Sequence, residues 1–154
     1  MSSRLFQRVR EQNGMTYAIY SYLASTVNSG MLTIYAGMNP SQAMKVLELI
    51  KDEGDKLIKS GITQKEFVEA KEQLKGGFVL GLESAVARMN RNGRVLLLNG
   101  KVLTMDEVIG NINNVTLDDI NRNIATMFDF GKLSASVVGK VNKNDDFYTM
   151  LTQI

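Results

Sequence analysis

The chain has 154 residues, 44% of them hydrophobic and 22% charged, and it contains neither cysteine nor histidine. This length predicts one soluble domain, 1–154, with a buried core, and no apolar run approaches the roughly 18 residues of a membrane span. The lack of cysteine excludes disulfides and thiolate chemistry, and together with the lack of a secretory signal it favours a cytoplasmic location. The net charge of +2 comes from interspersed acidic and basic residues, so we expect neither a nucleic acid nor a membrane partner.

The start of the sequence predicts one helix followed by a β-hairpin. Apolar residues recur at helical spacing, and Gly14 is placed to end that helix near Asn13. The segments 15–26 and 31–38 are rich in β-forming residues, and Asn28-Ser29-Gly30 between them supplies residues that tolerate positive φ. We therefore expect an antiparallel hairpin directly after the first helix.

Start and stop signals for helices recur through the middle of the chain. They are Asn39-Pro40, Gly61, the capping box Thr63–Glu66, Ser84, Asn99-Gly100, the capping box Thr104–Glu107, and Thr116 before a helix that runs to about Met127. Three glycines inside the helix that begins at Thr63 predict close packing against a neighbouring backbone: Gly76, Gly77 and Gly81.

The C-terminal part predicts a third strand, 133–141, followed by a closing helix, 143–154. The expected fold class is therefore α+β, with an antiparallel sheet of the hairpin and the C-terminal strand packed against several helices. Three strands are few for so many helices. We therefore expect the sheet to be incomplete, with further strands upstream of Met1.

Residues 1–21 place Arg10 seven positions before Tyr17, on either side of the first helix end. This segment resembles the start of the C-terminal half of pitrilysin/insulinase-type zinc peptidases, the inverzincins, which include bacterial proteins similar to processing peptidases. Further matching stretches follow in family order at 34–37, 61–74, 82–100 and 115–120. The resemblance implies that the chain forms most of the non-catalytic half of a two-half peptidase.

The same resemblance implies where the chemistry lies. In this family, zinc is held by an H-x-x-E-H helix of the other half, and a chain without histidine cannot supply that motif. The implied partners are the catalytic half, which would carry H-x-x-E-H and the zinc, and a peptide substrate added to a sheet edge of that half. We expect this chain to bind no metal and to be inactive alone.

Arg10 and Tyr17 are the candidate substrate-binding residues. From the residues alone, Arg10 offsets a helix dipole and Tyr17 is a half-buried strand residue. The resemblance instead implies that both lie beside the bound peptide, with Arg10 donating to a peptide carbonyl. The Tyr17 hydroxyl would then donate near the developing oxyanion and support the transition state. No catalytic residue is expected in this chain.

Two further patterns have ordinary interpretations. Arg88, Arg91 and Arg94 recur at helical spacing and could form a basic ridge, but a solvated helix face is the simpler explanation. Three glutamates at helical offsets match no zinc site without a histidine nearby: Glu66, Glu69 and Glu72.

Two other functions stay open at this level. The chain could be a non-enzymatic core or scaffold subunit of the same fold family, which the absence of an H-x-x-E-H motif upstream or in a neighbouring protein would favour. It could also be an unrelated α+β binding module that self-associates. Unpaired strand edges by themselves predict self-association of this chain.

Overall fold

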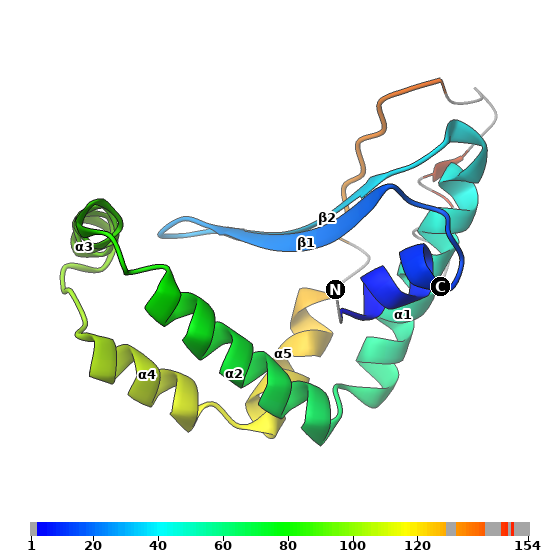
Figure 1. Ribbon diagram of the computed structural model, residues 1–154. Helices are drawn as coiled ribbons and strands as arrows, with labels where there is room; N and C mark the ends of the chain where they lie inside the picture. The colour runs from blue at the N-terminus through cyan, green and yellow to red at the C-terminus, as the bar shows by residue number, and fades with distance from the viewer. Residues whose placement is uncertain (1–2, 129–131, 141–145, 148, 150–154) are drawn as a thin grey trace. The chain divides into compact units, whose positions relative to one another are not determined.

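The computed structural model describes residues 3–128, 132–140, 146–147 and 149 (Figure 1). In chain order its elements are η1 (Phe6–Glu11), β1 (Ala18–Ser25), β2 (Gly30–Gly37), η2 (Pro40–Gln42), α1 (Ala43–Ser60), α2 (Gln64–Leu80), α3 (Ala85–Asn99), α4 (Met105–Asn114) and α5 (Leu117–Met127). They fall into two compact units. The first comprises Met1–Ser25, Ser29–Gly61 and Ile124–Ile154, and the second comprises Thr26–Asn28 and Ile62–Asn123. The single domain expected over 1–154 stays a prediction.

Strands β1 and β2 form the antiparallel hairpin that the alternation predicts (Figure 1). Ala18 pairs with Gly37 at its base, and the stacked rings of Tyr20 and Tyr35 have centroids 5.0 Å apart. No described residue of the connecting loop, 26–29, has a positive φ. The expected hairpin is confirmed, and its loop closes with ordinary backbone conformations although its residues tolerate positive φ.

The helix before the hairpin is wider than an α-helix. Phe6–Glu11 form a π-helix, in which the N–H of Gln12 donates to the carbonyl of Gln7 at 2.9 Å. Gly14 ends the helix with a φ of 60°, and its N–H donates to the carbonyl of Arg10 at 2.9 Å. This is the left-handed helix end that the sequence predicts, so the end near Asn13 is confirmed. π-helical segments are rare and frequently occur at functional sites.

The core of the first unit joins η1, β1 and α1. Val9 of η1 and Val46 of α1 are fully buried, and Ile19 of β1 and Leu49 of α1 are 6% and 4% exposed. Ile19 is the buried residue of β1, whereas Ser21 and Leu23, which share its face farther along the strand, are exposed. The hairpin is therefore anchored at its base, next to the helix end.

Short-range hydrogen bonds set the starts of the helices. Asn39 accepts from the N–H of Ser41 at 3.1 Å before η2, and Ser84 accepts from the N–H of Ala87 at 3.0 Å before α3. Three boxes pair a threonine with an acidic residue of the first turn: Thr63–Glu66, Thr104–Glu107 and Thr116–Asp119. Each satisfies N–H groups that a helix start leaves without partners. The helix starts predicted at these positions are confirmed.

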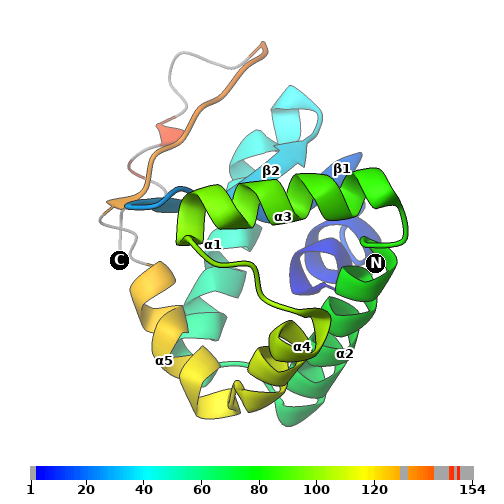
Figure 2. The same ribbon diagram turned by 90° about the vertical axis from the view of Figure 1, so that its left-hand side faces the viewer.

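Helices α2 and α4 of the second unit lie side by side (Figures 1 and 2). The ammonium of Lys71, on α2, donates to the carbonyls of Asn113 and Val115 at 2.8 and 2.9 Å. These carbonyls belong to the C-terminal end of α4, where a cation is favourable. Just before the start of α2, the N–H of Ile62 donates to the side chain of Asn121, on α5, at 3.1 Å.

The predicted third strand does not form in the described part of its segment. Residues 132–140 contain no strand, and the sheet of the described residues consists of β1 and β2. Val138 is 97% exposed. Alternation marks a segment that is able to pair, but a strand also has to lie alongside a partner strand, and the described residues 132–140 pair with none. The closing helix expected at 143–154 lies outside the described residues, except for 146–147 and 149.

The α+β class is confirmed by the helices and the open antiparallel hairpin. None of the helices in the described residues is long and apolar enough to cross a membrane. The close packing expected at Gly76 and Gly77 was wrong, because a Cβ built on either one meets no described atom within 4 Å. Gly81 instead lies at the end of α2, where its N–H donates to the carbonyl of Gly77 at 2.9 Å.

Replacing Gly76 or Gly77 by alanine should therefore raise the free energy of unfolding by about 0.5–1 kcal/mol each, because alanine loses less backbone entropy in a helix. Gly100→Ala is the matched control with the opposite sign, since the φ of Gly100 is 71°. Urea unfolding followed by circular dichroism measures all three variants. Destabilisation by Gly77→Ala would show that a neighbouring group occupies the space beside it.

Acid should weaken the starts of α4 and α5. The main-chain N–H of Thr104 lowers the pKa of Glu107, and the hydroxyl of Thr116 lowers the pKa of Asp119. A carboxylate whose pKa falls on folding contributes stability above its unfolded pKa, about 4, and this contribution is lost as the pH drops through the folded pKa. Unfolding measured from about pH 5 to about pH 2 should therefore be less acid-dependent in Glu107→Gln and Asp119→Asn than in the parent.

Candidate functional site

Arg10 and Tyr17 lie on either side of the turn at Gly14, within the first unit. Arg10 is exposed on η1, and its guanidinium carbon lies 5.0 Å from the centroid of the Phe6 ring. Tyr17 directly precedes β1, and its N–H donates to the carbonyl of Gly37 at 2.8 Å. Its side chain is 75% exposed. The hydrogen bond fixes the backbone of Tyr17 at the base of the hairpin, while its hydroxyl stays accessible.

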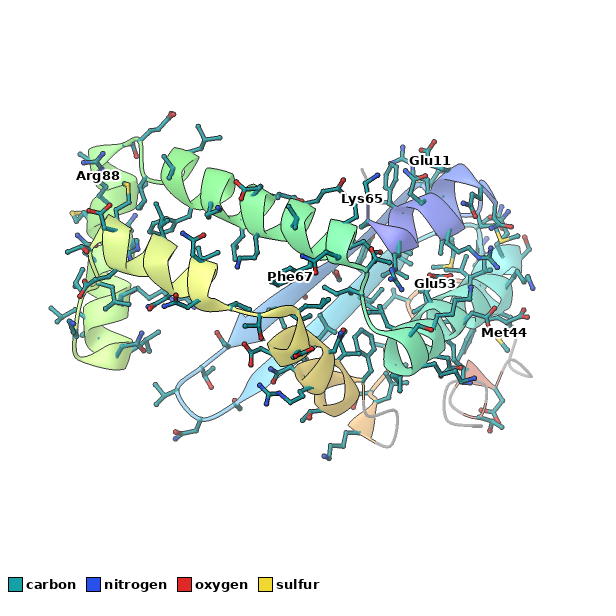
Figure 3. All side chains as sticks on the ribbon, turned by 90° about the horizontal axis from the view of Figure 1, so that it is seen from below. Glu11, Met44, Glu53, Lys65, Phe67 and Arg88 are labelled. Atoms are coloured by element: carbon teal, nitrogen blue, oxygen red, sulfur yellow. The ribbon has the colours of Figure 1, made fainter. Side chains whose placement is uncertain are left out.

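An ion pair sets which side of η1 faces α1. Glu53 of α1, labelled in Figure 3, is 7% exposed. Its carboxylate lies 3.7 Å from Nε of Arg8 and 2.7 Å from the ammonium of Lys56. A carboxylate this deeply buried needs cationic partners to offset its desolvation. Arg8 and the fully buried Val9 therefore turn toward α1, whereas Arg10 is left on the solvent side.

A hollow lies beside Tyr17. Its wall combines the turn before β1 with the segment after β2: Gly14, Met15, Thr16, Tyr17, Asn39, Ser41 and Gln42. The pairing of Ala18 with Gly37 brings these two segments together, because each adjoins the base of the hairpin. No charged residue lines the hollow.

The amide side chains of this wall have free hydrogen-bonding capacity. Oδ1 of Asn39 accepts from the N–H and the hydroxyl of Ser41 at 3.1 and 3.0 Å. The amide nitrogen of Asn39 and the side-chain amide of Gln42 have no hydrogen-bond partner within the described residues. Neutral amides that both donate and accept suit a peptide main chain.

The sequence pointed to Tyr17 but not to Asn39, Ser41 or Gln42 as neighbours of the site. Asn39 was recognised as a helix cap, and that role is confirmed. The strand register carried the missing signal, since pairing 18 with 37 places the residues just outside the hairpin next to each other. The roles of Arg10 and Tyr17 in substrate binding stay predictions.

The residues of this chain do not fit a zinc ion. Zinc in proteins takes histidine, cysteine and carboxylate ligands, and this chain has neither histidine nor cysteine. In the described residues, no three acidic side chains are grouped so that they could hold a metal. Glu66 completes the capping box of Thr63, while Glu69 and Glu72 pair with lysines at 3.8 and 2.6 Å.

Comparison with known proteins shows which family this chain resembles. The family model described as the peptidase M16 inactive domain matches residues 1–74, a segment that contains Arg10, Tyr17 and the whole hollow. The uncharacterized zinc protease YmxG of Bacillus subtilis is 48% identical over 121 residues, which cover 79% of this chain and 30% of that protein. An uncharacterized zinc protease of Streptomyces coelicolor is 42% identical over 139 residues, covering 90% of this chain and 30% of that protein.

A solved structure shows the same fold. The crystal structure of the peptidase M16 inactive domain from Pseudomonas fluorescens has a TM-score of 0.70 at 23% identity, over 80% of this chain and 29% of that chain. The chain belongs to the peptidase M16 family, whose relatives are named zinc proteases. Its residues 1–74 match the inactive domain of that family, and the resemblance inferred from its sequence is confirmed. It spans about 30% of the length of these relatives.

The position of Tyr17 should depend on the core beneath it. Leu49→Ala removes a side chain that is 4% exposed and should lower the free energy of unfolding by about 2–5 kcal/mol. The control Leu97→Ala, at a side chain that is 87% exposed, should change it by less than about 0.5 kcal/mol. Urea unfolding followed by tyrosine fluorescence measures both. Equal effects would mean that the burial of Leu49 does not hold the hairpin.

Proposed function

We propose that this chain is the substrate-binding, non-catalytic domain of a zinc-dependent metalloendopeptidase. The observation that carries the proposal is the setting of Tyr17. Its main chain is hydrogen-bonded at the base of the hairpin, its side chain is 75% exposed, and it borders an uncharged hollow. Because the backbone of this donor is already held, only its side chain has to be ordered before the hydroxyl can stabilise charge that develops on a peptide carbonyl.

Arg10 would contribute to binding more than to chemistry. Its guanidinium rests on the Phe6 ring at 5.0 Å, a contact that holds the cation while leaving N–H groups for a peptide carbonyl. Asn39 and Gln42 would add neutral hydrogen bonds to the main chain of the same peptide. This combination suits recognition of backbone rather than of one side chain.

Hydrolysis itself is assigned to a partner. We infer a catalytic half that carries an H-x-x-E-H motif and the zinc, either on the same polypeptide or on a second one. The relatives support this inference, because they are named zinc proteases and are more than three times as long as the segment that matches this chain. When bound there, zinc would activate water, and this chain would hold the peptide against it.

The test is peptide hydrolysis by this chain assembled with its catalytic half. Tyr17→Phe should lower kcat by about 10²-fold, the loss typical of one oxyanion donor. The matched control is Tyr22→Phe, which removes an exposed hydroxyl from the same hairpin and should leave the rate unchanged. Arg10→Ala should raise KM several-fold with a smaller effect on kcat.

Three outcomes would contradict the proposal. If Tyr17→Phe hydrolysed casein as fast as the parent assembly, the hydroxyl would have no role in the transition state. If the parent assembly bound zinc but hydrolysed no peptide, the scaffold function would be favoured. Zinc-dependent hydrolysis by the chain alone would contradict the assignment of chemistry to a partner.

A further inference from the structure

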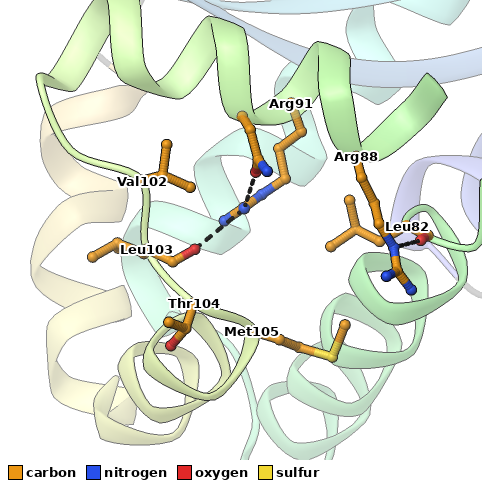
Figure 4. A pocket seen from close by; sticks show the side chains of 8 residues that line it. Leu82, Arg88, Arg91, Val102, Leu103, Thr104 and Met105 are labelled. Atoms are coloured by element: carbon orange, nitrogen blue, oxygen red, sulfur yellow. Dashed lines mark hydrogen bonds between the residues drawn. The ribbon is translucent and has the colours of Figure 1, made fainter. Parts of the chain in front are cut away.

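Two arginines of α3 border a second hollow, which lies wholly within the second unit (Figure 4). Nε of Arg88 donates to the carbonyl of Leu82 at 2.6 Å. One terminal nitrogen of Arg91 donates to the carbonyl of Leu103 at 3.3 Å and to the side chain of Asn92 at 3.1 Å. Arg88 is exposed, as the solvated-face interpretation expects, and Arg91 is half-buried. Each of the two also donates to a main-chain carbonyl next to the hollow.

These bonds leave much of the donor capacity of both guanidinium groups unused. A guanidinium carries several more N–H groups than the ones engaged by Leu82, Leu103 and Asn92. Within the described chain, neither Arg88 nor Arg91 forms an ion pair, and no acidic residue lines the hollow. Two cations thus border one space without a counter-charge from the protein.

The rest of the wall is largely apolar. Leu82, which is 9% exposed, Val102, Leu103 and Met105 surround the arginines (Figure 4). The guanidinium carbon of Arg91 also lies 5.1 Å from the centroid of the Phe78 ring. These apolar side chains offer contacts to hydrocarbon atoms on either side of a bound anion. The contacts to carbonyls and to the ring hold the planar groups in place before any ligand arrives.

We propose that this hollow binds a carboxylate group that is flanked by apolar atoms. A planar carboxylate accepts paired hydrogen bonds from guanidinium edges, and its single charge is cheaper to desolvate among leucine and methionine side chains than that of a phosphate. The carboxylate can come from the end of a peptide chain or from an acidic side chain. The site is independent of the proposed substrate-binding role, because none of its residues belongs to the hollow beside Tyr17.

Three small peptides test the site on the 154-residue chain. They are acetyl-Gly-Gly-Leu with a free terminal carboxylate, the same peptide with a terminal amide, and acetyl-Asp-Gly-Leu amide. Binding is followed by NMR through the shifts of the Arg91 side chain and the Leu103 and Met105 amides. At least one acid should bind about five- to tenfold more tightly than the uncharged peptide, since hydrogen bonds to charged groups are the stronger ones. Whichever acidic peptide binds more tightly identifies the source of the carboxylate, a chain end or an acidic side chain. Added salt should weaken the binding of that peptide.

The variants separate a built site from general charge attraction. Arg88→Gln and Arg91→Gln should each abolish the preference for the acid, whereas the control Arg94→Gln, an exposed arginine of the same helix that does not line the hollow, should keep it. Arg88→Lys should restore only part of the preference, because lysine keeps the charge but not the planar fork. Circular dichroism establishes that each variant is folded. Loss of Arg91 could loosen the segment around Leu103, which it holds by a hydrogen bond. In that case the site is tested by Arg88→Gln and by comparing how the parent chain binds the acids and the amide.

Two results would overturn the site. One is equal binding of the acids and the uncharged peptide by the parent chain, or no binding of any of the three. The other is an equal loss of preference in Arg94→Gln and Arg88→Gln, which would show that only the net charge of the helix matters.

Discussion

The first unit depends on the burial of Val9 and Ile19 against α1. These two residues lie on either side of the turn at Gly14, so one apolar contact fixes both the helix before the turn and the strand after it. Arg10 directly follows Val9, and Tyr17 lies two residues before Ile19. Each candidate site residue is thus attached to a buried neighbour, which is how an exposed side chain acquires a defined position.

The proposed function separates peptide binding from zinc chemistry. Under that proposal, a peptide would be held by an accessible hydroxyl, a cation and neutral amides, and the first unit offers all of these near the base of its hairpin. Activating water requires a metal with its ligands, and a chain without histidine or cysteine lacks the side chains that hold zinc most often. Binding and chemistry can therefore reside in separate parts of one enzyme, each with its own packing requirements.

Features encoded over a few residues could be predicted from the sequence, and features that need a distant partner could not. The capping boxes at Thr63 and Thr104 and the helix end at Gly14 are decided by neighbours within one or two turns. The strand expected at 133–141 needs a partner strand beside it, and alternation alone carries no information about whether the segment lies beside one. Gly76 and Gly77 suggested a closely packed neighbouring backbone. A glycine in a helix shows only that there is no side chain, and here no described atom fills the space.

The site was predictable to a similar extent. Arg10 and Tyr17 could be selected by spacing and resemblance, because both lie within a short segment. Asn39 and Gln42 join them only through the register of the hairpin, which a single sequence does not fix.

The boxes at Thr63, Thr104 and Thr116 also bear on how the chain folds. Each closes a loop of only three residues, so little chain entropy opposes it, and the helices between 62 and 123 can nucleate before the two ends of the hairpin meet.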